Sequence, residues 1–88
     1  MKAYAIKAVV KLKDYYRDPE GETARDALRS LGYPVKKVNV GKTYFIIVEA
    51  SSEEEAVKLV EGMCENLLAN PVKDDWTIEV IGVADDQG

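Results

Sequence analysis

The segment Thr43–Ala50, TYFIIVEA, constrains the fold more than any other stretch of this chain. It predicts a strand, and the side chains of a strand alternate between its two faces. One face carries three apolar residues, Tyr44, Ile46 and Val48. Phe45 and Ile47 lie on the other face, where a sheet that meets water on one side usually has polar residues. We therefore expect this strand to be covered on both faces.

Alternation also predicts a first strand, and a helix follows it. Ala3–Lys13 alternates between an apolar side and a side rich in lysine, as a half-buried strand does. Asp18 and Pro19 predict the start of a helix, because aspartate caps free N–H groups and proline has none to lose. Apolar residues then recur at helical spacing up to Gly32, which predicts a helix over 19–31.

The stretch between this helix and Thr43 allows two interpretations. Residues 35–40 predict a short second strand, and Gly41-Lys42 predicts a tight turn into the strand that begins at Thr43. One long bent strand over 35–50 is the alternative, and the sequence leaves the choice open.

The second half of the chain predicts another helix and a last strand. Ser51 and Ser52 each have a glutamate three residues later, the spacing of a capping box at a helix start. An apolar stripe follows through Leu68, and Asn70-Pro71 ends the helix because the residue before proline avoids the α region. Trp76–Ile81 then alternates as a strand.

These elements give the order β-α-β-β-α-β in one domain, residues 1–81, followed by an acidic tail, 82–88, that we expect to fray. The order predicts an α+β, ferredoxin-like fold of two layers, with an antiparallel sheet and two helices on one face. A chain of 88 residues buries only about 60% of its unfolded surface, so association with another chain is expected.

The second face of the sheet is the predicted interaction surface. Phe45 and Ile47 are neighbours on it, and Val9 from the first strand, with Ile81 from the last, adds to it. We expect this face to pack against another chain. The sequence also suggests Gly41 and Lys42, at the predicted turn, as a site that faces a partner.

Composition argues against independent catalysis. The chain has no histidine and one cysteine, Cys64, and it lacks a Walker loop and a GxGxxG phosphate-binding loop. A formal net charge of -4 argues against nucleic acid as a partner. No apolar run approaches the roughly 20 residues that a membrane span needs, so we expect no membrane contact and a cytoplasmic location.

A succession of short motifs carries a family resemblance over about residues 2–80. The motifs are Lys11-Leu12-Lys13, Asp18-Pro19-Glu20-Gly21, Ala27-Leu28, Leu31-Gly32-Tyr33, Val40-Gly41-Lys42, Met63-Cys64 and Leu67-Leu68-Ala69-Asn70-Pro71-Val72. In this order and at this spacing they resemble the PurS family, the small accessory subunit of phosphoribosylformylglycinamidine synthase.

The resemblance implies a subunit of an amidotransferase complex in purine biosynthesis. In that complex a glutaminase subunit releases ammonia, and a large synthetase subunit uses it with ATP and Mg²⁺. The small subunit would bridge the two as a homodimer or a dimer of dimers, with no cofactor and no catalytic residue of its own. The alternative function is a regulatory domain of the ACT type, which has the same element order and binds a small effector.

Overall fold

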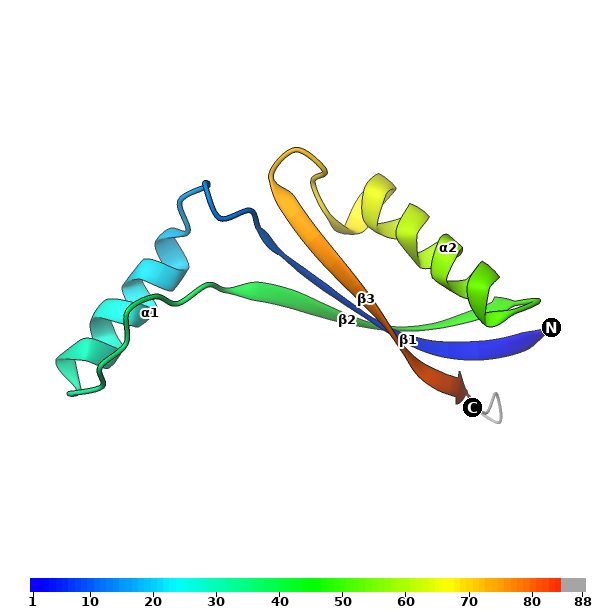
Figure 1. Ribbon diagram of the computed structural model, residues 1–88, viewed down its shortest axis with the longest axis horizontal. Coiled ribbons are helices and arrows are strands. Elements are labelled where there is room, and N and C mark those ends of the chain that lie inside the picture. Colours follow the sequence, from blue (N-terminus) through cyan, green and yellow to red (C-terminus); the bar gives the residue numbers. More distant parts are fainter. Residues whose placement is uncertain (85–88) are drawn as a thin grey trace.

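The computed structural model describes residues 1–84 as three strands and two helices, one of which continues into a π-helical turn. The elements are β1 (Lys2–Leu12), α1 (Pro19–Ser30), β2 (Gly41–Ala50), α2 (Glu53–Met63), η1 (Cys64–Leu68) and β3 (Asp74–Ala84). The strands form one antiparallel sheet in the order β2-β1-β3. The α+β class expected from the sequence is confirmed (Figure 1).

Neither interpretation of residues 35–50 is correct, because the structure has no hairpin there and no strand over the whole range. Residues 35–40 form no strand, and β2 begins at Gly41 without a turn before it. The predicted turn was wrong because Gly41 serves another purpose. It is paired with Lys11, and a Cβ there would lie 2.8 Å from the backbone oxygen of Val10. Glycine is needed here for close strand contact.

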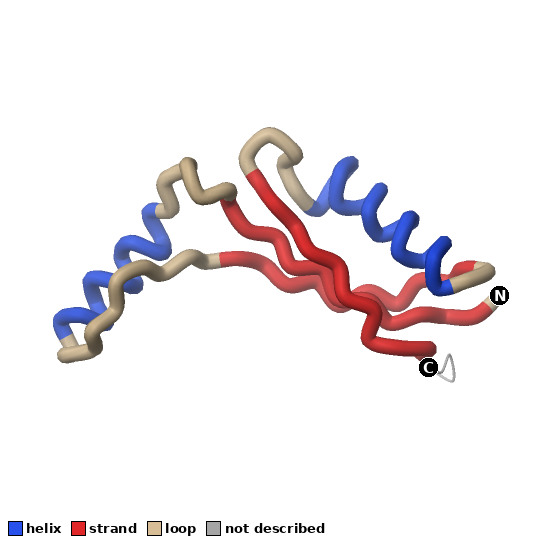
Figure 2. The backbone as a smooth tube through the Cα atoms, in the orientation of Figure 1, coloured by secondary structure: helices blue, strands red, loops and turns tan. Residues whose placement is uncertain are grey.

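Only one of the two helices covers the sheet. α2 packs across all three strands, whereas α1 extends beyond the end of the sheet, as Figures 1 and 2 show. The expectation of two helices on one face was wrong, because the chain after α1 runs back alongside the helix and enters β2 beyond the helix start, so that α1 projects past the sheet (Figure 1). We call Pro19–Val40 the arm.

The arm makes the molecule long for its size. The radius of gyration is 16.5 Å and the principal extents are 51 × 29 × 17 Å. A compact domain of 88 residues has a radius of gyration of about 12 Å. The chain exposes 6379 Å², and a compact monomer of its mass exposes about 5,200 Å². This chain therefore exposes surface that a compact domain of the same mass would bury.

The core lies between α2 and the sheet. Its fully buried centre is Ile6 on β1 with Val60 on α2 and the Cys64 thiol. The core residues of the strands lie on the predicted inner faces and include Tyr4, Ala8, Tyr44, Ile46, Val48, Trp76 and Ile78. Those added by α2 and η1 are Ala56, Val57, Met63 and Leu68. Trp76 also donates its indole N–H to Glu61 on α2 at 3.2 Å. The alternation in the sequence therefore identified the inner face correctly.

Asp18 fixes the base of the arm. Its carboxylate accepts hydrogen bonds from the backbone N–H of Gly21 at 3.0 Å and of Val40 at 2.8 Å. The first bond caps α1 as predicted, and the second joins the start of the helix to the end of the arm. The bonds from Val40 and Gly21 lower the pKa of Asp18. The arm is thus closed at its base by one side chain.

The ends of α2 follow the predicted signals. Ser52 accepts the N–H of Glu55 at 3.1 Å, and the Glu55 carboxylate reaches back to Ser51, as in a capping box. At the other end the π-helical turn closes with Ala69 N–H donating to the Cys64 carbonyl at 3.0 Å. This widened turn leaves Leu67, expected to finish the apolar stripe, 82% exposed.

The last strand is longer than predicted. β3 runs from Asp74 to Ala84, with a bulge opposite Ala5 and Ile6. Residues 82–84, expected to belong to the tail, are therefore part of the sheet. The rest of that expectation concerns 85–88, which lie outside the described residues.

Gly21 offers a test of the arm. A Cβ there would clash with the Val38 carbonyl oxygen, so Gly21→Ala should lower the free energy of unfolding by about 1–3 kcal/mol. Gly62→Ala is the matched control, since only Asn66 comes within 4 Å, and it should raise that free energy by about 0.5–1 kcal/mol. Urea unfolding measures both. Equal effects of the two variants would contradict the close packing at Gly21.

Candidate interaction surfaces

The outer face of the sheet, opposite α2, carries exposed apolar side chains. Phe45 is 73% exposed and Ile47 is 63% exposed, and Val9 lies half-buried on the same face. Ile81, at the bulge of β3, is 57% exposed. Three of the five residues predicted for an interface, Val9, Phe45 and Ile47, thus share one face.

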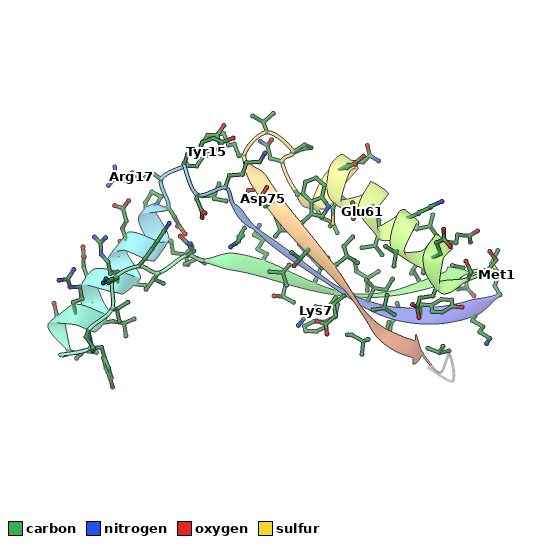
Figure 3. All side chains as sticks on the ribbon, viewed as in Figure 1. Met1, Lys7, Tyr15, Arg17, Glu61 and Asp75 are labelled. Atoms are coloured by element: carbon green, nitrogen blue, oxygen red, sulfur yellow. The ribbon has the colours of Figure 1, made fainter. Side chains whose placement is uncertain are left out.

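Strand pairing determines which large, small and charged side chains are neighbours on the outer face. Phe45 pairs with Lys7, which pairs in turn with Glu79 on β3. The Lys7 ammonium lies 3.1 Å from the Glu79 carboxylate, and Figure 3 shows Lys7 on the side away from α2. The neighbouring row joins Ile47 to Ala5 and Gly82. Ile47 therefore lies beside two small residues, whereas Phe45 lies beside an ion pair.

The other two predicted residues face a different space. Lys42 is on the α2 side of β2, and with Gly41 it borders an open hollow of about 480 Å³. We call it the inner hollow. Its apolar lining comes from the ends of β1, η1 and the arm, namely Val10, Leu12, Val40 and Leu68. Asp18, Glu20 and Asp74 supply acidic groups.

A second open hollow, of about 420 Å³, lies at the base of the arm and is mainly polar. Its charged groups are largely paired. Arg17 lies 3.1 Å from Glu22, and Lys37 lies 3.9 Å from Asp14. The rings of Tyr15 and Tyr16 lie beside it with centroids 4.8 Å apart, and Figure 3 shows Tyr15 and Arg17 on the loop that leads to α1.

Within residues 1–84, no group of three or more histidine, cysteine, aspartate or glutamate side chains is arranged to hold a metal ion. Cys64 is buried, and burial, with a smaller contribution from the charge of Glu61, raises the pKa of its thiol. It is a core residue. No helix in the described part of the chain is long and apolar enough to cross a membrane.

The sequence did not predict the exposed apolar face of α1, because both helices were expected to lie on the sheet. α1 carries the predicted apolar stripe, yet Leu31 at its end is 75% exposed and only Gly21 is buried in the helix. The signal was present in the sequence as amphipathic spacing, but spacing cannot tell which chain covers a helix. The fold and these surfaces define a small α+β protein with apolar surface open on both sides of its sheet.

Comparison with known proteins identifies the family. The PurS family, described as "Phosphoribosylformylglycinamidine (FGAM) synthase", matches residues 5–82. The phosphoribosylformylglycinamidine synthase subunit PurS of Archaeoglobus fulgidus is 49% identical over 70 residues, which cover 78% of this chain and 88% of the relative. The chain belongs to the PurS family, whose members are subunits of phosphoribosylformylglycinamidine synthase in purine biosynthesis.

Two solved structures agree with this assignment. The crystal structure of Methanocaldococcus jannaschii PurS has a TM-score of 0.80 and 39% identity, with 92% of this chain and 99% of that chain covered. The structure of PurLQS from Thermotoga maritima contains a chain with a TM-score of 0.86 and 36% identity, with 92% and 100% covered. The resemblance that the sequence motifs indicated is confirmed, and the ACT-type alternative is not favoured.

The outer face can be tested by charge. Phe45→Glu with Ile47→Lys should weaken self-association more than tenfold, because two exposed apolar anchors become charges that a contact would have to desolvate. Sedimentation measures the assembly, and circular dichroism checks that the chain stays folded. Val72→Glu, at a 67% exposed residue in the loop after η1, is the control. Unchanged sedimentation of the double variant would contradict the interface.

Proposed function

We propose that this chain is the non-catalytic assembly subunit of phosphoribosylformylglycinamidine synthase, and that it bridges a glutaminase subunit and a large ATP-dependent synthetase subunit. Its task would be to hold the two enzymes so that ammonia passes from one to the other. The same proposal places the chain in the cytoplasm, as the sequence led us to expect.

One observation carries this proposal. The chain matches, at a TM-score of 0.86, a chain of the PurLQS structure of Thermotoga maritima, with 92% of this chain and 100% of that chain covered. A chain of that fold occurs there together with other subunits. The same fold here leaves Phe45 and Ile47 exposed on one side and the inner hollow open on the other. Two open surfaces suit a subunit that works by contact.

Self-association is part of the proposal, as a homodimer or a dimer of dimers. A standard interface removes about 800 Å² from each partner. The exposed area of this chain exceeds that of a compact monomer by an amount on the order of 1,000 Å². Burial of one interface of standard size would therefore reduce the exposed area of each chain to about that of a compact monomer.

We assign the chemistry to the partner subunits. The hollow at the base of the arm is polar, and its Arg17 and Lys37 form exposed ion pairs with Glu22 and Asp14. The chain supplies no histidine for acid–base catalysis. ATP and Mg²⁺ would bind the synthetase subunit, and this chain would hold neither.

The function is tested by reconstitution. The chain is mixed with candidate glutaminase and synthetase subunits, and the complex is assayed once with glutamine and once with ammonia. Omission of the chain should abolish the glutamine-dependent activity and leave the ammonia-dependent activity, because only ammonia transfer needs the bridge. Equal activity with and without the chain on glutamine would contradict the proposal.

Lys42 tests the contact with a partner subunit. Lys42 is exposed and borders the inner hollow. Lys42→Ala should reduce co-purification of the partner subunits and lower the glutamine-dependent activity severalfold, with little effect on stability. Lys58→Ala, at an exposed lysine of α2, is the control. If Lys42→Ala assembles normally, Lys42 is not a contact residue.

A further inference from the structure

The hollow at the base of the arm gathers positive charge in a chain that is acidic overall. Four of the chain's 12 lysine and arginine residues line it, namely Arg17, Arg25, Lys36 and Lys37. We call it the basic hollow. The formal net charge of the whole chain is -4, so a group of cations stands out on its surface. Opposite charges across a contact guide the encounter and fix its orientation, and an acidic partner would be guided to this hollow.

The carboxylates of the basic hollow are fewer than its cations. Three line it, and one of them, Asp18, accepts backbone N–H groups from Gly21 at 3.0 Å and from Val40 at 2.8 Å. Asp18 belongs to no ion pair among residues 1–84. Its charge is therefore directed at the backbone of the arm. Only Asp14 and Glu22 remain among the lining carboxylates to pair with the cations.

The ion pairs of the hollow can be exchanged for others. Arg17 lies 3.1 Å from Glu22, and Lys37 lies 3.9 Å from Asp14, with all four side chains between 38% and 80% exposed. Exposed pairs of this kind contribute only about 0–1 kcal/mol. Lys36 is exposed and forms no ion pair within the described part of the chain. A carboxylate from another chain can therefore bind here without breaking a strong contact.

Two tyrosines lie beside these cations. The rings of Tyr15 and Tyr16 are 4.8 Å apart at their centroids, and Tyr15 is 76% exposed. Figure 3 shows Tyr15 on the same loop as Arg17. Tyrosine and arginine are enriched among the residues that contribute most to protein–protein binding. A partner can thus pack an apolar side chain on the Tyr15 ring while its carboxylates pair with the cations.

The walls of the basic hollow are already fixed within the chain. On one side the Tyr16 N–H donates to the Lys13 carbonyl at 3.0 Å, and the Lys13 N–H donates to the Lys73 carbonyl at 2.8 Å. On the other side Gly21 approaches the Val38 backbone so closely that no Cβ fits. Binding would therefore order little additional backbone, which lowers its entropic cost.

The shape of the hollow favours a protein segment over a small molecule. Sites for small ligands are mostly apolar and bury about 70–90% of the ligand surface. This hollow is open and mainly polar, and most of the side chains that line it are exposed. Its volume of about 420 Å³ has room for side chains at the tip of a loop. A net charge of -4 opposes nucleic acid as the occupant.

We infer that the basic hollow is the docking site for an acidic loop of an enzyme subunit of the synthase complex. The carboxylates of that loop pair with Arg17, Lys36 and Lys37, and its apolar tip packs on Tyr15. The inference rests on the proposed function and deepens it, because it names the surface and the chemistry of one contact that the bridge needs.

Charge reversal tests the docking in the reconstituted complex. Lys36→Glu with Lys37→Glu should weaken assembly with the synthetase and glutaminase subunits more than about tenfold at low salt. At about 1 M salt the loss should become small, because the Debye length falls to about 3 Å. Lys58→Glu with Lys73→Glu is the matched control, with the same change of net charge at exposed lysines outside the hollow. Equal effects of the two pairs would overturn the inference.

Tyr15→Ala tests the aromatic half of the contact. It should weaken assembly severalfold at low and at high salt, because it removes contact area and no charge. The unfolding midpoint should stay unchanged, since the Tyr15 side chain is exposed. A loss of affinity that disappears at high salt would contradict packing on the Tyr15 ring.

Sedimentation of the chain alone separates this docking from self-association. The Lys36→Glu, Lys37→Glu variant should form the same oligomer as the unchanged chain. A changed oligomer would make a second copy the occupant and would overturn the inference. If the unchanged chain does not assemble with the enzyme subunits, the proposed function itself fails. Normal assembly of the charge-reversed variant contradicts only the docking site.

A direct titration locates the binding on the full chain, with poly-glutamate as the probe. The backbone amide NMR signals of residues 15–17 and 36–37 should shift, and those of Phe45 and Ile47 on the outer face should not. The absence of shifts at the basic hollow would overturn the inference. Single-stranded RNA is the second probe. Equal shifts of the same signals with RNA would show that the hollow accepts any polyanion, and would overturn the assignment to an acidic protein loop.

Discussion

The structure depends on the straight passage of the backbone from the arm into β2. Two contacts hold it. Asp18 accepts the Val40 N–H, and Gly41 lies against the backbone of β1 where no Cβ fits. Because the chain cannot turn there, α1 is carried off the sheet, the inner hollow stays open and the molecule reaches 51 Å in length. A local constraint on two residues therefore leaves part of the sheet uncovered by the chain's own first helix.

Much of the fold could be predicted because most signals in this sequence are local. Alternation placed the inner face of each strand, Asp18 and Ser52 marked helix starts, and Asn70-Pro71 marked a stop. The predicted turn failed because Gly41 has two physical uses, a positive φ or a close approach, and the sequence does not distinguish them. The placement of α1 failed for a related reason, since an apolar stripe does not say which chain covers it.

The sequence pattern also predicted only part of the candidate interaction surfaces. Period-two alternation was sufficient to place Phe45 and Ile47 on the face away from α2. It also placed Lys42 on the opposite side, and treating it as part of a turn hid this. Pattern thus assigns a residue to a face of the sheet, whereas the hollow beside Lys42 arises from the distant Leu12, Val40 and Leu68, which only the folded backbone brings together.

The ion pair between Lys7 and Glu79 has a consequence for any contact made by the outer face. It lies in the row of Phe45, so a chain that covers Phe45 also removes water from the pair. Because the two charges already satisfy each other, the covering chain need not supply an opposite charge, but it must tolerate a dipole beside its apolar surface. A partner surface with only hydrocarbon groups would remove water from the ion pair without replacing the lost hydrogen bonds. A partner surface with one polar group opposite Glu79 would replace one of them. A surface that covers Phe45 must therefore accommodate the charges of Lys7 and Glu79 as well as the phenyl ring.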